Sequence, residues 1–227
     1  MKPALSHLLV CLLCCASVAH AQDKLQDGLP LTGMQKPAAV AQLLFQAIDT
    51  NELREIERLI KLGTHLPARN DAGETPLYVA AEKGSLDALR LLIDGRSDVR
   101  LRTPNGETAL HAAAMRDNPA FVQLLLDAGS EPNSLNRNGE TPLAWAAMTG
   151  TLHTAQTLVE RGAIINAVDE RGNTPLHGAA ASGNLDMTVF LLQRQARASL
   201  RNQEGRTPRD MAHERGFPDI VKVLDQP

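Results

Sequence analysis

Cysteine is the residue type of this sequence with the widest chemical repertoire, and its placement limits what it could do. All three cysteines, Cys11, Cys14 and Cys15, lie close to the N-terminus. Cys11 and Cys14 form a C-x-x-C pair, which supports redox or zinc chemistry only on a folded βαβ or zinc module. Their neighbours form an apolar run instead, so we interpret the pair as part of a hydrophobic segment.

The histidines and serines show no catalytic pattern either. His111 and His177 lie two copies of the repeat described below apart, about 20 Å if each copy advances by one helix diameter, so their side chains should not converge on one metal ion. His213 and Glu214 are not followed by the second histidine of an H-E-x-x-H motif, and the sequence has neither a G-x-S-x-G elbow nor a glycine-rich phosphate loop. We therefore predict no catalytic residues, no metal and no cofactor, and expect that the protein is not an enzyme.

The elements that position these side chains follow from an internal repeat of 33 residues. A fixed period of this length is typical of repeat proteins. A glycine marks each copy, and a threonine follows two residues later. The glycines are Gly73, Gly106, Gly139, Gly172 and Gly205, and the threonines are Thr75, Thr108, Thr141, Thr174 and Thr207. Most threonines are followed by Pro-Leu, so the copies are in phase.

The repeated segment resembles the ankyrin repeat, whose signature T-P-L-H-x-A appears as Thr174 to Ala179. The resemblance covers about residues 37 to 227. It implies an all-α repeat solenoid in which each unit contributes two helices and a β-hairpin finger, and it implies a structural hydrogen bond near the preceding turn for His111 and His177. We assign units at 37–69, 70–102, 103–135, 136–168, 169–201 and 202–227, of which the first and last are caps with polar outer faces.

Two local expectations follow from the register. The position after each first helix favours a left-handed backbone, which glycine adopts readily and aspartate tolerates, so we expect it at Gly84 and at Asp117. The pairs Asn105-Gly106 and Asn138-Gly139 are strong turn signals, since both residues of each pair accept positive φ.

The N-terminal segment reads as an export signal. Lys2 precedes an apolar run from Leu5 to Ala16, which is short for a membrane span, and Ala19 to Ala21 supplies a small-x-small cleavage site. We predict a signal peptide at 1–21, a flexible leader at 22–36 and a periplasmic mature protein. An uncleaved anchor is the alternative; a lipoprotein anchor on Cys15 is disfavoured by the residues before it.

Charge and hydropathy restrict the partner. The chain has 23 basic and 26 acidic residues; without Lys2 the 23 become 22, and the net charge is −4. This balance argues against nucleic acid or an anionic membrane. We therefore expect a monomer that binds another protein, with no membrane insertion of the mature chain.

In ankyrin arrays the partner usually lies against the concave face, which finger tips and first helices form. At one finger position the register gives Glu74, Glu107 and Glu140, followed by Asn173 and Arg206. Exposed first-helix positions add a second set. It comprises Tyr78, Met115, Trp145 and Met148. These seven acidic, aromatic and methionine residues are our candidate partner-binding site. The alternatives are an ordinary solvated column for the glutamates and packing between repeats for Trp145.

We thus expect a non-catalytic protein-binding scaffold of the periplasm. One narrower alternative is an immunity or inhibitor protein for a toxic periplasmic enzyme. The other is an accessory to catalase or peroxide defence, because similar exported bacterial ankyrin proteins have been associated with that role.

Overall fold

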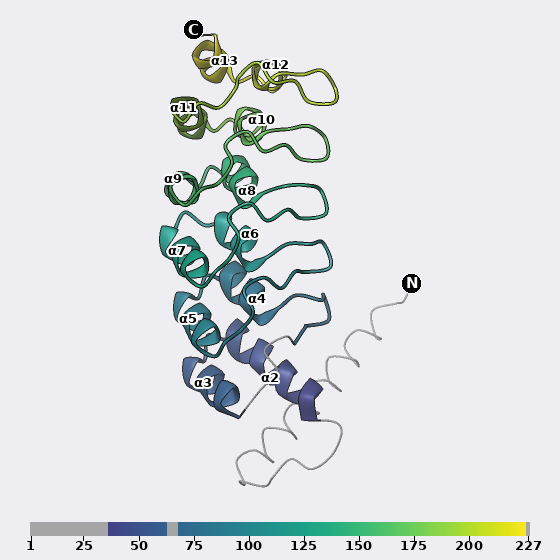
Figure 1. Cartoon of the computed structure of the whole chain (residues 1–227), viewed down its shortest axis with the longest axis vertical. Helices are drawn as coiled ribbons and strands as arrows, with labels where there is room; N and C mark the ends of the chain where they lie inside the picture. Colours follow the sequence, from purple (N-terminus) through teal and green to yellow (C-terminus); the bar gives the residue numbers. More distant parts are fainter. Residues whose placement is uncertain (1–35, 63–67, 226–227) are drawn as a thin grey trace, which may run out of the picture.

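A computed structural model describes residues 36–62 and 68–225. The predicted signal peptide and nearly all of the predicted leader lie outside these residues, as do residues 63–67 of the predicted first unit and 226–227 of the last. Within the described part, twelve helices follow one another in pairs and stack into an elongated array with the C-terminal pair at one end (Figure 1). The array is an all-α repeat solenoid, as the resemblance implied.

The helices form two layers that run along the array (Figure 1). The inner layer, on the side of the fingers, consists of the first helix of each pair: α2 (Lys36–Asp49), α4 (Pro76–Lys83), α6 (Ala109–Ala114), α8 (Pro142–Thr149), α10 (Pro175–Ala181) and α12 (Pro208–Glu214). The outer layer consists of the second helices: α3 (Leu53–Lys61), α5 (Leu86–Asp94), α7 (Pro119–Asp127), α9 (Leu152–Glu160), α11 (Leu185–Gln193) and α13 (Pro218–Leu224).

The signature residues explain where the first helices begin. Thr75, Thr141 and Thr207 are N-caps whose hydroxyls each accept a backbone N–H three residues later at 3.2 Å. Proline follows each of them at the first helical position, where its missing N–H costs nothing. Gly84 and Gly150 then end α4 and α8 in the left-handed conformation.

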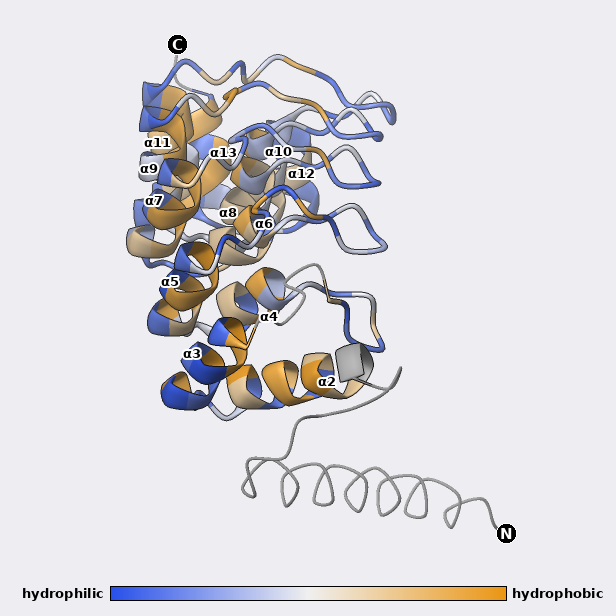
Figure 2. Cartoon of the chain, turned by 60° about the horizontal axis from the view of Figure 1, so that its bottom comes forward, coloured by the Kyte–Doolittle hydropathy of each residue, from blue (hydrophilic) through white to orange (hydrophobic). Residues whose placement is uncertain are grey.

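The core is aliphatic and alanine-rich. Leu110, Leu143 and Leu176 are fully buried at one register position, and paired alanines such as Ala146 and Ala147 allow neighbouring first helices to approach closely. Figure 2 shows apolar residues concentrated on the helices and hydrophilic ones at the finger tips. In the N-terminal pair, the outer helix α3 is largely hydrophilic. Each unit buries its apolar faces only against its neighbours, as expected of a repeat array.

The fingers are hydrogen-bonded turns at residues 70–74, 103–107, 136–140, 169–173 and 202–206. In each finger the first N–H donates to the fifth carbonyl; from Thr103 to Glu107, for example, the distance is 2.8 Å. Successive fingers are joined by single backbone bonds of 2.8 Å, such as Arg137 N to Asn105 O. Pro104 occupies the donor position between the first two fingers and has no N–H.

Three local expectations are wrong. Asn105 and Asn138 do not have positive φ; only the glycine of each pair does, because the finger turn needs one left-handed residue. Asp117 is not left-handed either. Helix α6 ends early, at Ala114, and the Asp117 carboxylate instead accepts the His153 N–H at 2.8 Å and thereby caps α9 in the next unit.

Candidate functional site: the groove between fingers and first helices

The fingers project beyond the inner helix layer (Figure 1). Residues of the fingers and of the first helices line hollows on this side of the array, and we call this surface the groove. Two hollows lie in it. One, near the N-terminal end, is lined by residues of α2, α4 and the first finger, including Arg69, Glu74 and Glu82. The other, of about 510 Å³, lies against α8, α10 and α12 and includes Glu140 and Met148. Glu74, Glu140 and Met148 of the predicted site therefore line the groove.

The three glutamates of the predicted acidic column also hold the finger turns together. Glu74 accepts a hydrogen bond from Asn70 Nδ2 at 2.7 Å, and Glu107 accepts one from the Thr103 hydroxyl at 3.0 Å. Glu140 accepts one from Asn136 Nδ2 at 2.7 Å. Each carboxylate thus has an intramolecular role whether or not a partner binds.

Trp145 is half-buried and is tied to this column. Its indole Nε1 donates to Glu140 Oε2 at 3.0 Å, and its ring contacts His111 of the preceding unit. The packing explanation that the sequence left open therefore has direct support. The ring remains partly exposed beside the groove, so packing and binding are compatible.

Tyr78 is almost fully buried, in contrast to the two methionines of the predicted site. Burial, together with the carboxylates of Glu107, Glu82 and Glu74, raises the pKa of its phenol. Tyr78 occupies the signature histidine position of its unit, and its ring therefore lies under the neighbouring finger. Only a small part of it is accessible to a partner.

Met115 and Met148 are the large apolar residues that are exposed on the described part of the inner helix layer. Met115 is 51% exposed and Met148 is 40% exposed. Met148 extends across the next helix, where Gly178 has no side chain; a Cβ added there would lie 2.9 Å from Met148 Cγ. Flexible thioether side chains of this kind adapt readily to a partner surface.

Leu135 and Val168 were missed by the sequence reasoning. They are 49% and 56% exposed, and they occupy the register position that holds arginine in the other units. Arg69, at that position, lines the N-terminal hollow and donates to the Gly73 and Arg102 carbonyls. Comparison of this position across the units would have revealed the change from arginine to aliphatic residues at Leu135 and Val168.

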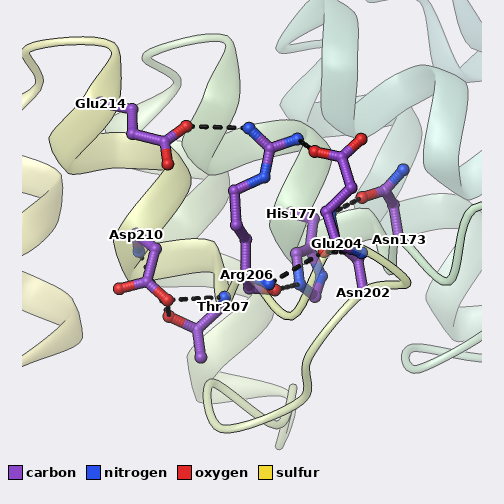
Figure 3. Close-up of polar contacts among 8 residues, drawn as sticks. All are labelled: Asn173, His177, Asn202, Glu204, Arg206, Thr207, Asp210 and Glu214. Atoms are coloured by element: carbon purple, nitrogen blue, oxygen red, sulfur yellow. Dashed lines mark hydrogen bonds and ion pairs between the residues drawn. The ribbon is translucent and has the colours of Figure 1, made fainter.

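Arg206, the basic end of the column, is neutralised locally (Figure 3). Its guanidinium contacts Glu214 at 2.8 Å and also pairs with Glu204. The hydrogen bond to Glu214, with the nearby charge of Glu204, raises its pKa. The predicted switch from acidic to basic along the fingers is therefore weakened, because this cation has two carboxylate partners.

His111 and His177 are buried and structural. The Thr108 N–H donates to His111 Nδ1 at 3.1 Å, so the ring proton is on Nε2, which donates to the Glu140 carbonyl of the next finger at 3.1 Å. Burial lowers the pKa of His111 to about 4. His177 repeats the arrangement with Thr174 and the Arg206 carbonyl. Each histidine joins its own helix to the following finger.

Among the described residues, no three His, Cys, Asp or Glu side chains are grouped so that they could hold a metal ion. None of the helices in this part of the chain has the length and hydrophobicity needed to cross a membrane.

A protein whose paired helices stack at a fixed period, with turns projecting from one side, belongs to the class of helical repeat solenoids. A family model described as ankyrin repeats (3 copies) matches residues 43–135, 95–169, 113–202 and 164–226. The chain therefore belongs to the ankyrin-repeat family. A search of curated proteins gave no significant match. Ankyrin repeats generally mediate protein–protein interaction and are typically non-catalytic.

Proposed function

We propose that this protein is a non-catalytic scaffold of the periplasm that binds another protein in the groove between its fingers and first helices. The observation that carries the proposal is the exposure of Met115 and Met148 on the inner helix layer, together with Leu135 and Val168 immediately before the third and fourth fingers. Exposed aliphatic and methionine side chains at adjacent units are the anchors that a protein interface buries.

The column formed by Glu74, Glu107 and Glu140 would increase the rate at which a partner associates and would contribute little to how tightly it is held. Glu74, Glu107 and Glu140 keep their finger hydrogen bonds, but their charge remains beside the groove. A partner with basic residues around an apolar anchor would be attracted by this charge and held by the anchor. Glutamine at all three positions would then slow association and leave the dissociation rate nearly unchanged.

The periplasmic part of the proposal rests on the signal-like segment at 1–21. Intact mass of the protein from a periplasmic fraction tests it. A species that begins at Gln22 supports export and cleavage. A product that retains Met1, or one that only detergent extracts, contradicts it.

The binding part is tested with a matched pair of variants in cross-linking and affinity capture from that fraction. Met115→Arg places a charge in the groove, whereas Leu185→Arg places the same charge on an exposed apolar position of α11, in the outer layer. A protein captured by the wild type and by Leu185→Arg, but not by Met115→Arg, supports the groove. Equal capture by all three contradicts it, provided that thermal midpoints agree.

An immunity or inhibitor protein and an accessory to catalase or peroxide defence are narrower forms of the same activity. The identity of the captured protein distinguishes them: a toxic enzyme in the first case, and catalase or another peroxide-consuming enzyme in the second.

A further inference from the structure

We propose that the hollow between Met148 and Met211 accepts one aromatic side chain of the partner, and that the ring packs against both methionines and stacks on Arg215. This inference rests on the proposed function, because it names the chemistry of a partner that the groove would bind. Met148, Met211 and Arg215 all line the 510 Å³ hollow against α8, α10 and α12.

The hollow exists because two positions of the repeat carry unusually small side chains. Ala144 stands where His111 and His177 fill the space under the following finger in their units. Gly178 stands where the preceding unit has Trp145 and the following unit has Met211. Both Ala144 and Gly178 line the hollow. Met148 extends over Gly178, and the space that histidine fills at His111 and His177 is left unfilled by Ala144.

The walls of the hollow suit an aromatic ring. Met148 and Met211 lie on its helix side, and thioether sulfurs make favourable contacts with ring edges. Arg171 on the finger and Arg215 at the end of α12 line it as well, and guanidinium groups stack on aromatic faces. An aromatic side chain therefore gains contacts on several sides that an aliphatic one would lack.

The charged side chains of the hollow nearly balance one another. Glu140 is hydrogen-bonded to Trp145 and Asn136, and Asp169 Oδ1 accepts finger N–H groups, including that of Asn173 at 2.7 Å. None of the five charged lining side chains, Glu140, Asp169, Glu170, Arg171 and Arg215, has an ion pair among the described residues. Three carboxylates thus face two guanidinium groups, so charge does not draw a further anion into the hollow, and the ring would be held by its contacts with the methionines and arginines.

The probe for this proposal is a displayed library of random 12-residue peptides, selected on the purified protein. We expect enriched peptides to carry an aromatic residue. We expect their dissociation constants to rise at least about tenfold in Ala144→His, which places at this position the histidine found at His111 and His177 and fills the hollow. Arg215→Glu should weaken the same peptides by a similar factor.

Controls separate the hollow from the rest of the groove. Leu185→Arg should leave the affinity for the peptides unchanged. Because Arg215→Glu alters an exposed side chain, this variant is expected to fold even if Ala144→His does not. Enriched peptides that lack aromatic residues, or that bind Ala144→His and Arg215→Glu as tightly as the wild type, overturn the proposal, as does a failure to enrich any peptide. If Met115→Arg lowers the affinity for the peptides but Ala144→His and Arg215→Glu do not, the proposed aromatic site is wrong and the groove remains the proposed binding surface.

Discussion

The indole ring of Trp145 stands edge-on to the imidazole of His111, with ring centroids 5.4 Å apart and ring planes at 74°. The two residues belong to adjacent units, and both bind Glu140. His111 is hydrogen-bonded to the Glu140 backbone carbonyl, and Trp145 donates to the Glu140 carboxylate. One finger is therefore held by two aromatic side chains from two different helices. This arrangement ties the finger at 136–140 to α6 and α8.

Trp145→Phe separates the two contributions of the indole. Phenylalanine keeps a ring against His111 but cannot donate to Glu140, so we expect a loss of about 1 kcal/mol in the free energy of unfolding. Trp145→Ala removes the ring as well and should cost about 2–3 kcal/mol. Urea unfolding followed by circular dichroism measures both. Equal losses would mean that the hydrogen bond contributes all of the effect.

Acid should destabilise the protein through His111. Because burial lowers its folded-state pKa to about 4 from an unfolded value of 6.5, the unfolded state binds more protons between these values. Stability is therefore retained above pH 6.5 and falls as the pH decreases towards 4, by about 3 kcal/mol for this residue alone. Burial also lowers the pKa of His177, which acts in the same direction.

Urea melts at pH 7.5, 5.5 and 4.5 test this dependence. His111→Gln should be less stable than the wild type at pH 7.5, yet lose less stability on acidification. His153→Gln, at an exposed histidine, is the comparison variant. A pH dependence of unfolding that is the same in His111→Gln and the wild type would show that His111 does not cause it.

Ser130 and Ser134 form a natural pair of test sites in one loop. Both are buried, but the Ser134 hydroxyl donates to the Glu131 carbonyl at 2.9 Å, whereas Ser130 Oγ has no hydrogen-bond partner. Ser130→Ala should therefore be neutral or stabilise by up to about 1 kcal/mol, and Ser134→Ala should cost about 1 kcal/mol. Alanine already occupies the Ser130 position at Ala163 and Ala196. Chemical denaturation of the two variants decides; a large loss from Ser130→Ala would indicate an unseen partner.

Leu125 and Leu224 test the difference between an internal unit and a cap. Leu125 is fully buried in α7, so Leu125→Ala should cost about 2–5 kcal/mol. Leu224 lies half-buried at the end of α13, where only one neighbouring unit packs, and its truncation should cost less. Unfolding curves of both variants provide the comparison. Equal losses would contradict the assignment of the last unit as a cap.

The periodic features of the fold could be predicted because they depend on local chemistry that recurs every 33 residues. The threonine caps and the left-handed Gly84 and Gly150 are examples. Asp117 was predicted wrongly, because its carboxylate finds backbone N–H groups in the next unit, and the sequence of one unit does not show that alternative.

The candidate site was only partly predictable for a related reason. Side-chain types alone identified Met115, Met148 and Trp145, but the hydrogen bonds of Glu140 depend on residues from two helices. The hollow at Ala144 and Gly178 arises because these residues have smaller side chains than the residues at the same register positions of neighbouring units. Such a space becomes visible only when the neighbouring helices are placed beside one another.

Pro104 interrupts the series of backbone hydrogen bonds that joins the fingers. The last four fingers are linked by consecutive backbone hydrogen bonds, while the first finger depends on the Arg69 side chain, which reaches the Arg102 carbonyl just before the second finger at 2.7 Å. A side-chain link has several rotatable bonds, whereas a backbone bond restrains both of the segments that it joins. We therefore expect the first finger to adjust its position against a bound partner more easily than the four fingers that follow it.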